Sequence, residues 1–135
     1  EDIPQVLAEC RRVLKNGGRF LCSTYGKQHM REITDLVQQF HKEIVLSAEV
    51  LYERFGLENG ENLLAPYFPE IQMRRYEDAI EIAEAEPLIS YILSCHGNQN
   101  QLLLNQYKEF REFVSARVAD GFYITKDAGI FLCRK

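Results

Sequence analysis

The clearest candidates for chemistry in this chain follow its most strand-like segment. Thr24, Tyr25 and Gly26 come shortly after the apolar residues Phe20–Cys22, and His29 follows three positions later. In an open α/β sheet, ligands bind beyond the carboxyl ends of the strands, so these residues are predicted to line the mouth of a substrate-binding site. A tyrosine hydroxyl or an imidazole there could orient an acceptor or take its proton. The structural alternative is that Tyr25 packs on the next helix and His29 lies on that helix's surface.

Other candidate residues carry weaker signals. Arg54 and Tyr91 could line a substrate pocket, but packing or surface positions are the more common fate of both residue types. The pair Cys95–His96 suggests a thiolate beside an imidazole. Neighbouring residues on a helix point in different directions, which argues against a catalytic pair there.

The motifs that mark catalytic and metal sites are absent. No glycine-rich phosphate-binding loop, zinc-protease motif or nucleophile-elbow motif occurs. The cysteines are far apart, with no C-x-x-C spacing, and each histidine stands alone, so no metal site is predicted. The residues by themselves therefore assign no catalytic side chain and no metal ligand.

Composition restricts the class of protein. The chain has 135 residues, 46% hydrophobic and 27% charged, which predicts a single globular domain with its own core. No apolar run approaches the ~18 residues of a membrane span. The net charge of -4 argues against a nucleic-acid partner, and the basic groups at residues 11–15 and 74–75 are interpreted as solvated faces. Dispersed cysteines without a signal peptide favour reduced thiols and a cytoplasmic location.

Hydrophobic periodicity predicts alternating helices and strands. Asp2 is a plausible helix N-cap, a glycine at position 17 or 18 can adopt the left-handed conformation that ends a helix, and Gly121 is the predicted C-cap of the last helix. Residues 126–129 have good turn chemistry, so the C-terminal segments are either two strands or two arms of one bulged strand. Helices are expected over residues 3–15, 28–40 (or starting at 27), 48–55 (capped by Ser47), 58–65, 86–95 and 102–120. Strands are expected over residues 19–25, 71–82 (bent near 77–79), 122–125 and 130–134. Residues 96–101 are expected to form a polar loop. This order predicts an α/β fold.

Three segments carry a family resemblance. Residues 6–21 read VLAECRRVLKNGGRFL, which resembles the helix and fifth strand of class I S-adenosylmethionine-dependent methyltransferases, with Asn16 where that family usually has proline. Residues 55–60, with 67–68 and 76–78, are similar to the cap and sixth strand of small bacterial members. Residues 124–133 are similar to their closing seventh strand. The first motif is fairly specific to the family, and the other two are less specific.

The resemblance implies part of a Rossmann-like sheet. Residues 19–25 would be its fifth strand, 71–82 its sixth, and the C-terminal strand its seventh, antiparallel and between the other two. The remaining helices would flank the sheet and cap the substrate side. The family's cofactor-binding elements, a glycine-rich turn and an acidic residue after the early strands, have no counterpart in these residues. No cofactor-binding residue is therefore carried over.

Two functions follow as expectations. In the first, the chain is the C-terminal, substrate-side portion of a methyltransferase domain, inactive alone, whose parent protein uses S-adenosylmethionine to methylate a small molecule. The chain begins with Glu1, and residues 1–4 suit the start of a helix, which also suggests a larger protein. In the second, the chain is a non-catalytic α/β binding module that forms a homodimer through an exposed sheet edge.

Overall fold

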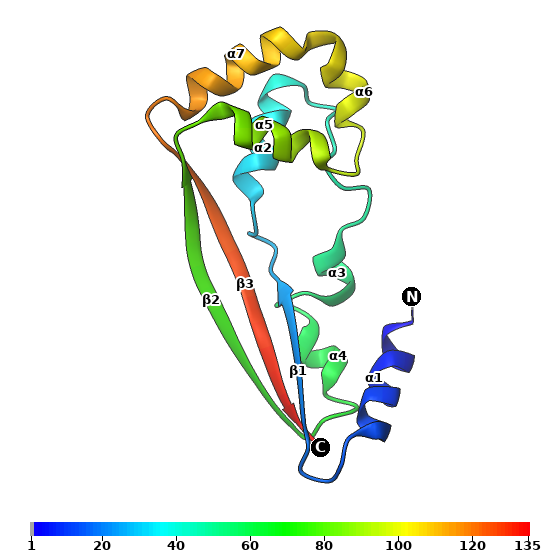
Figure 1. The fold of residues 1–135 in the computed structure, drawn as a ribbon. Coiled ribbons are helices and arrows are strands. Elements are labelled where there is room, and N and C mark those ends of the chain that lie inside the picture. The colour runs from blue at the N-terminus through cyan, green and yellow to red at the C-terminus, as the bar shows by residue number, and fades with distance from the viewer. Residues whose placement is uncertain (1) are drawn as a thin grey trace. The chain divides into compact units, whose positions relative to one another are not determined.

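The computed structural model describes residues 2–135 and has an α/β fold; Glu1, expected to lead into the first helix, lies outside the described residues. Three strands and several short helices alternate along the chain, and a 3-10 turn precedes the last helix (Figure 1). The elements are α1 (Ile3–Val13), β1 (Arg19–Tyr25), α2 (Arg31–Phe40), α3 (Leu51–Phe55), α4 (Gly60–Leu64), β2 (Glu70–Ile82), α5 (Ala85–Ser94), α6 (Gln99–Leu103), η1 (Leu104–Gln106), α7 (Tyr107–Val118) and β3 (Phe122–Arg134).

The three strands form one open sheet in the order β1-β3-β2. β3 is antiparallel to β1, with Arg19 opposite Arg134 and Tyr25 opposite Ala128. The arrows of β2 and β3 also point in opposite directions (Figure 1). The C-terminal strand is therefore in the middle and antiparallel, which confirms the strand order that the resemblance implies.

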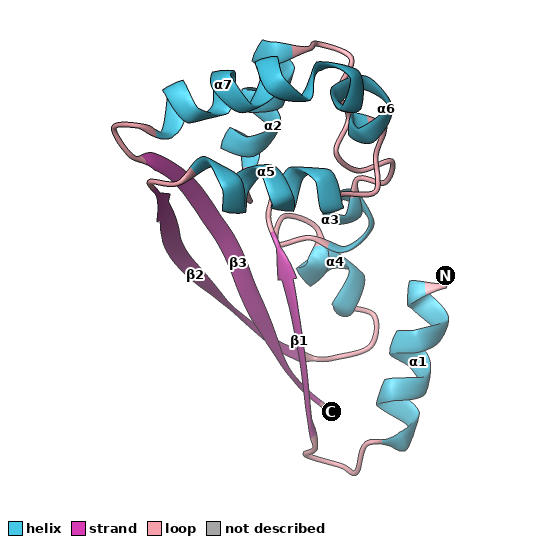
Figure 2. Cartoon of the chain, turned by 45° about the horizontal axis from the view of Figure 1, so that its top comes forward, coloured by secondary structure: helices cyan, strands magenta, loops and turns pink. Residues whose placement is uncertain are grey.

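The chain divides into two compact units. Unit 1 contains the chain up to His29, Leu51–Glu77 and Asp127–Lys135, and unit 2 contains Met30–Val50 and Asp78–Lys126. The chain thus passes from one unit to the other within β2 and again within β3. Between β1 and β2 the chain consists of helices and loops (Figure 2).

The core of unit 1 lies against one face of the sheet. Side chains alternate between the two faces of a strand, so Phe131 and Cys133 of β3 share a face with Phe20 and Cys22 of β1. Leu7 of α1, Leu64 of α4 and the loop residue Phe68 pack in the same apolar cluster. Phe20 and Phe68 stack with ring centroids 5.3 Å apart. One face of this part of the sheet is thereby covered by helices.

The core of unit 2 is helical. It collects the apolar stripes of three amphipathic helices, and Ile124 of β3 joins it. Phe40 meets Phe110 edge to face, with centroids 5.2 Å apart. The buried residues of these three helices are Ile33, Leu36 and Val37 of α2, Leu88, Ile89 and Ile92 of α5, and Phe110, Val114 and Val118 of α7, and Leu103 of α6 is buried with them. In the part of the chain that the structure describes, no helix has both the length and the apolar character needed to cross a bilayer.

Several predicted helix boundaries are confirmed. Asp2 caps α1, its Oδ1 accepting a hydrogen bond from the Gln5 amide at 3.1 Å. Of the two glycines after α1 it is Gly17 that adopts the left-handed conformation, with φ of 74°, and the predicted C-cap Gly121 has φ of 89°. β1 spans the predicted residues, because Phe20–Cys22 supplies apolar side chains on consecutive positions.

Other boundaries differ from the prediction, and in each case hydrogen bonds favour another backbone path. α2 begins at Arg31 and not at residue 27 or 28, because the amides of Lys27 and Gln28 bind carboxylates outside the helix. α3 begins at Leu51, since the Ser47 hydroxyl donates to the Glu49 carbonyl instead of capping a helix.

The predicted long helix over residues 102–120 is also wrong. Residues 99–101 of the predicted polar loop join residues 102–103 in α6 (Gln99–Leu103), and η1 separates α6 from α7. Gln99 begins α6 fully buried, with its amide bonded to the Cys95 carbonyl. Residues 126–129 are not a turn, because β3 continues through them.

Candidate functional site

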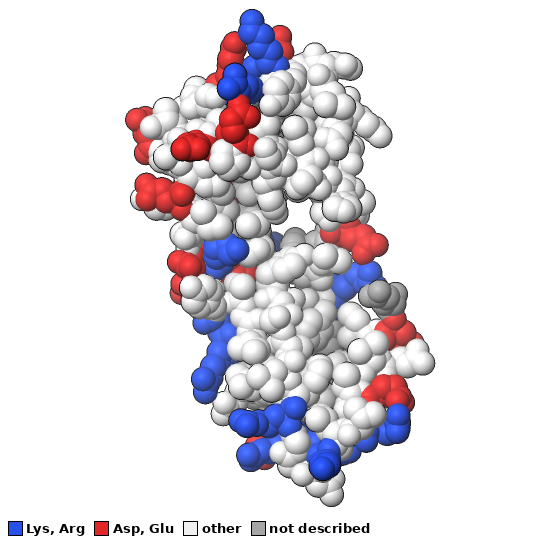
Figure 3. Space-filling model, in the orientation of Figure 1, with Lys and Arg blue, Asp and Glu red and all other residues white. Residues whose placement is uncertain are grey.

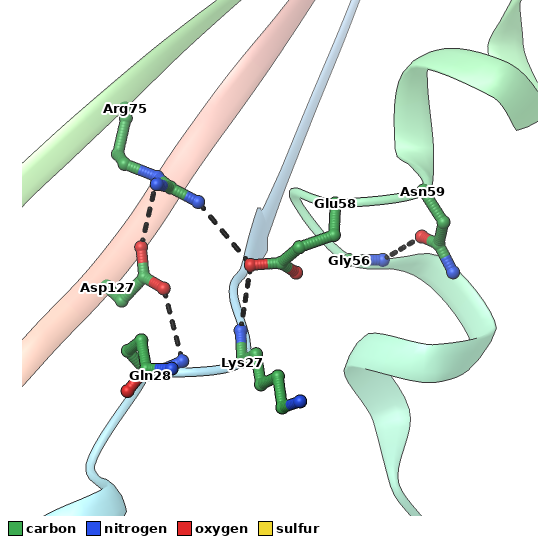
Figure 4. Close-up of polar contacts among 7 residues, drawn as sticks. All are labelled: Lys27, Gln28, Gly56, Glu58, Asn59, Arg75 and Asp127. Atoms are coloured by element: carbon green, nitrogen blue, oxygen red, sulfur yellow. Dashed lines mark hydrogen bonds and ion pairs between the residues drawn. The ribbon is translucent and has the colours of Figure 1, made fainter.

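The backbone turns away from the sheet directly after β1. Gly26 still pairs with β3, its amide donating to the Asp127 carbonyl at 2.9 Å. The next two amides bind side chains instead: Lys27 donates to Glu58 Oε1 at 3.1 Å, and Gln28 donates to Asp127 Oδ2 at 3.2 Å. Two carboxylates therefore hold the loop that follows the strand (Figure 4).

Arg75 joins these two carboxylates. Its Nε lies 3.1 Å from Asp127 Oδ1, and its Nη2 lies 3.4 Å from Glu58 Oε1. We refer to Glu58, Arg75 and Asp127 as the Arg75 cluster. Its members come from the loop before α4, from β2 and from β3, and Figure 4 shows them converging on the end of β1.

The members of the Arg75 cluster differ in exposure. The Asp127 side chain is 7% exposed, whereas those of Arg75 and Glu58 are 37% and 46% exposed. Charges interact more strongly where water is excluded, so the Asp127–Arg75 pair carries more of the electrostatic stabilisation than the Glu58–Arg75 pair. A buried carboxylate without such partners would be costly, which explains why Asp127 is bonded at both oxygens.

Glu58 is presented by a compact loop. Asn59 Oδ1 accepts from the Gly56 amide at 2.7 Å, and Asn59 Nδ2 donates to the Glu53 carbonyl at the same distance. The Leu57 amide donates to the Tyr25 carbonyl at 3.3 Å, which fixes the loop to the end of β1.

The structure brings the four predicted site residues together in unit 1. The Thr24 hydroxyl donates to the Phe55 carbonyl at 2.6 Å. The rings of Tyr25 and His29 stack, with centroids 5.1 Å apart and planes 27° apart. Gly26 lies between Thr24–Tyr25 and the turn that leads to His29, whose amide donates to the Gly26 carbonyl at 3.1 Å. His29 is therefore in a turn before α2 and not on that helix.

These side chains differ in what they can do chemically. Burial raises the pKa of the Tyr25 hydroxyl above its ordinary value, so the phenol stays protonated at neutral pH and can donate a hydrogen bond. The Thr24 hydroxyl is already used in holding the Phe55 carbonyl. The stacked Tyr25–His29 pair is thus the part of the site that can contact a ligand. The Arg75 cluster positions the loop of residues 26–28, which connects Tyr25 to His29.

Arg54 and Tyr91 do not belong to this group. Arg54 lines a surface hollow of about 630 Å³ in unit 1 with Ile3, Pro4 and Leu63. Tyr91 belongs to unit 2, where its hydroxyl lies 3.4 Å from Met30 Sδ. The Cys95–His96 pair also belongs to unit 2, and burial raises the pKa of the Cys95 thiol, which disfavours a reactive thiolate.

The Arg75 cluster was not predicted from the sequence. The sequence pattern predicts a solvated strand face for Arg74–Arg75 and a turn for Asp127. The sequence carries no clear signal for the cluster, because apolar residues occupy both faces of β3 here, and only the structure shows that Asp127, Gly129, Phe131 and Cys133 alternate along one buried face. A strand of that period places Asp127 on the covered face, where a charged residue requires a partner.

Among residues 2–135, no group of three or more histidine, cysteine, aspartate or glutamate side chains is arranged to hold a metal ion. Comparison with known proteins adds no identification: no protein-family model matches the chain, and no curated protein matches its sequence.

Proposed function

We propose that this chain is the substrate-side portion of an S-adenosylmethionine-dependent methyltransferase that acts on a small molecule. The observation that carries the proposal is the sheet order β1-β3-β2, with the C-terminal strand antiparallel in the middle. The fifth, seventh and sixth strands of the family have this order. The most specific sequence motif, residues 6–21, also falls on α1 and the start of β1, in agreement with the family's helix and fifth strand.

The site geometry is compatible with methyl transfer. Displacement of a methyl group from a sulfonium depends on alignment and exclusion of water more than on an acid or base. Tyr25 and His29, at the carboxyl end of β1, would orient the acceptor, and the Arg75 cluster would keep their loop in place. The net charge of -4 over the whole chain favours a small-molecule acceptor over a nucleic acid.

The test uses a longer protein, in which any polypeptide encoded upstream of Glu1 is joined to this chain. We expect the joined protein to bind S-adenosylmethionine in isothermal titration calorimetry and to transfer a tritiated methyl group to an acceptor. The chain of residues 1–135 alone is the control and should do neither. A folded joined protein without affinity for S-adenosylmethionine would overturn the proposal.

Substitution of the aromatic pair tests its positioning role. Tyr25→Phe removes the hydroxyl and His29→Ala removes the stacked ring. We expect each variant to raise KM for the acceptor while the dissociation constant for S-adenosylmethionine stays unchanged, because the pair is proposed to contact only the acceptor. Ser23→Ala, on the exposed face of β1, is the matched control.

A second function, a homodimerisation module, is favoured by the outer edge of β1. The Gly26–Asp127 bond shows that even-numbered residues of β1 direct their backbone groups towards β3, and the Leu57–Tyr25 bond shows that odd-numbered ones direct theirs outward. At this edge the amides and carbonyls of Arg19, Leu21 and Ser23 have no backbone partner among the described residues. Leu21 is also 53% exposed.

A second copy could pair antiparallel with this edge, Leu21 against Leu21 and Arg19 against Ser23. This register uses all of the open backbone groups and covers both Leu21 side chains. Ser23→Pro removes an outward amide without breaking the ladder to β3, so it should convert a dimer to a monomer in sedimentation velocity. Val6→Lys, on exposed α1 surface, should not. A native chain that is monomeric at about 100 μM would exclude this second function, because a dimer with an interface of standard size is still assembled at that concentration.

A further inference from the structure

The exposed face of the sheet in unit 1 carries an unusual set of charges. Arg19 and Arg134 lie directly opposite each other on β1 and β3. Their neighbours Phe20 and Cys133 point into the apolar cluster, so the two arginines lie on the other face. Arg74 of β2 joins them around a surface cavity of about 560 Å³, which Glu70, Gln72 and Leu132 also line.

Positive charge in this cavity is only partly neutralised. Arg134 Nη1 lies 3.6 Å from Glu70 Oε2. Within residues 2–135, neither Arg19 nor Arg74 forms an ion pair. Of the three guanidinium groups that line the cavity, only that of Arg134 therefore has a carboxylate partner.

The cross-strand position of Arg19 and Arg134 makes this arrangement costly for the fold. Like charges directly opposite on neighbouring strands destabilise a sheet. The covered face of the same sheet shows the opposite situation, because Arg75 there has two carboxylate partners. A solvated strand face accounts for the exposure of these arginines. It does not account for the position of Arg19 and Arg134 directly opposite each other at the wall of a cavity.

We propose that this cavity is a binding site for a small dianionic oxyanion of the phosphate type. Guanidinium groups match such an anion in charge and in hydrogen-bonding geometry, each donating two parallel N–H bonds. The anion would convert the Arg19–Arg134 repulsion into a shared attraction, and the Gln72 amide is a further donor at the wall. Figure 3 shows Lys and Arg side chains gathered at the end of unit 1 where β1 begins and β3 ends.

The cavity is separate from the candidate site described above. Arg19 and Arg134 lie at the start of β1, whereas Thr24–His29 lie at its end, and a strand of this length covers about 20 Å. Arg74 lies further along the sheet, beside Gly129, but on the face opposite its neighbour Arg75. The anion site thus goes beyond the proposed function, and it can be present or absent whether or not the chain belongs to a methyltransferase.

The direct test uses the native chain and inorganic phosphate. Phenylglyoxal modifies accessible arginines, and peptide mass spectrometry quantifies each one. We expect phosphate to slow modification of Arg19, Arg74 and Arg134 relative to chloride at equal ionic strength. Arg12, on exposed α1 and paired with Glu9, is the internal control and should react equally in both salts. The proposal would be overturned if each of the four arginines reacted at the same rate in phosphate as in chloride.

Variants provide the second test. Equilibrium dialysis should show phosphate binding to Arg19→Gln and Arg134→Gln weakened about tenfold, because each change removes a charge-assisted pair of hydrogen bonds. Arg12→Gln, with the same loss of charge outside the cavity, should bind as the native chain does. In chloride, Arg19→Gln should be as thermostable as the native chain or more so, since it relieves repulsion. Weakening by Arg12→Gln to the same extent would indicate general charge attraction and contradict a defined site.

Discussion

Gly26 lies against the carboxylates of the Arg75 cluster. A Cβ at this position would lie 2.8 Å from Glu58 Oε1 and closer still to the Asp127 carboxylate. Its φ is not positive, so alanine is penalised here by contact and not by backbone conformation. We expect Gly26→Ala to lower the free energy of unfolding by about 1–3 kcal/mol, as overpacking does elsewhere. Urea unfolding measures this loss.

Gly17 provides the informative comparison for Gly26→Ala. A Cβ there would meet nothing within 4 Å, but φ is 74°. Gly17→Ala should therefore cost about 1–2 kcal/mol through conformation alone. If Asp127→Ala is added, the loss at Gly26 should shrink and the loss at Gly17 should not. A loss at Gly26 that is unchanged by Asp127→Ala would show that the carboxylate is not what excludes the methyl group.

The two ion pairs of Arg75 should differ in strength. A double-mutant cycle with Asp127→Asn and Arg75→Gln should give a coupling energy of about 1–3 kcal/mol, because the aspartate is buried and its hydrogen bonds are charge-assisted. The cycle with Glu58→Gln should give below about 1 kcal/mol, because half-exposed pairs are screened by water. Urea unfolding at pH 7 measures both. Equal coupling energies would contradict the role assigned to burial.

Glu32 should make stability depend on pH. Burial acts to raise the pKa of its carboxyl, but hydrogen bonds from the Thr125 hydroxyl and amide outweigh it, with help from Arg31, and the pKa is lowered from 4.5. A lowered pKa in the folded state gives stability that is present above the unfolded pKa and is lost as pH falls through the folded value. Thermal melts from pH 6 to pH 3 should show a steeper decline for the native chain than for Glu32→Gln. Thr125→Val, which removes only the hydroxyl bond, should fall between them.

At the scale of elements, the sequence pattern predicts a helix or strand correctly where residues within that element determine its structure. β1 and α1 were found as expected, because Phe20–Cys22 is apolar throughout and Asp2 is an effective N-cap. α2 was extended too far because nothing local shows that the amides of Lys27 and Gln28 bind carboxylates distant in sequence. Such long-range partners also explain why the Arg75 cluster escaped prediction while Thr24–His29, adjacent in the chain, did not.

The turn expected within β3 illustrates the same limit. Lys126–Gly129 has the composition of a turn, and turn propensity is a local property. In the structure Asp127 bonds Arg75 and the Gln28 amide, and Gly129 lets the backbone of β2 approach: a Cβ there would be 2.9 Å from the Arg74 carbonyl. Tertiary contacts thus override the local preference and keep the strand continuous.

The buried faces of the unit 2 helices should dominate their stability. Leu88 of α5 is 1% exposed and Leu104 of η1 is 64% exposed. Leu88→Ala should cost about 2–5 kcal/mol through lost burial and a residual cavity, and Leu104→Ala should stay within about 0.5 kcal/mol. Chemical denaturation compares these matched substitutions. A similar cost at both positions would show that α5 does not pack as described.

At the scale of the whole molecule, the question is whether the two units unfold together. Each has its own apolar cluster, which favours separate unfolding. Both β2 and β3, however, are continuous strands of 13 residues that belong in part to each unit. Unfolding one unit alone would end the β2–β3 ladder in the middle and leave backbone groups without partners at the break.

This cost leads us to expect a single cooperative transition. Leu64→Ala in unit 1 and Leu88→Ala in unit 2 should each lower hydrogen-exchange protection in both units, because protection by global unfolding follows the stability of the whole chain. Two unfolding transitions, with the midpoint of each shifted by only one of the substitutions, would contradict this. They would mean that interrupting the β2–β3 ladder costs less free energy than either apolar core contributes to stability. The single domain predicted from chain length would then be two folding units joined by shared strands.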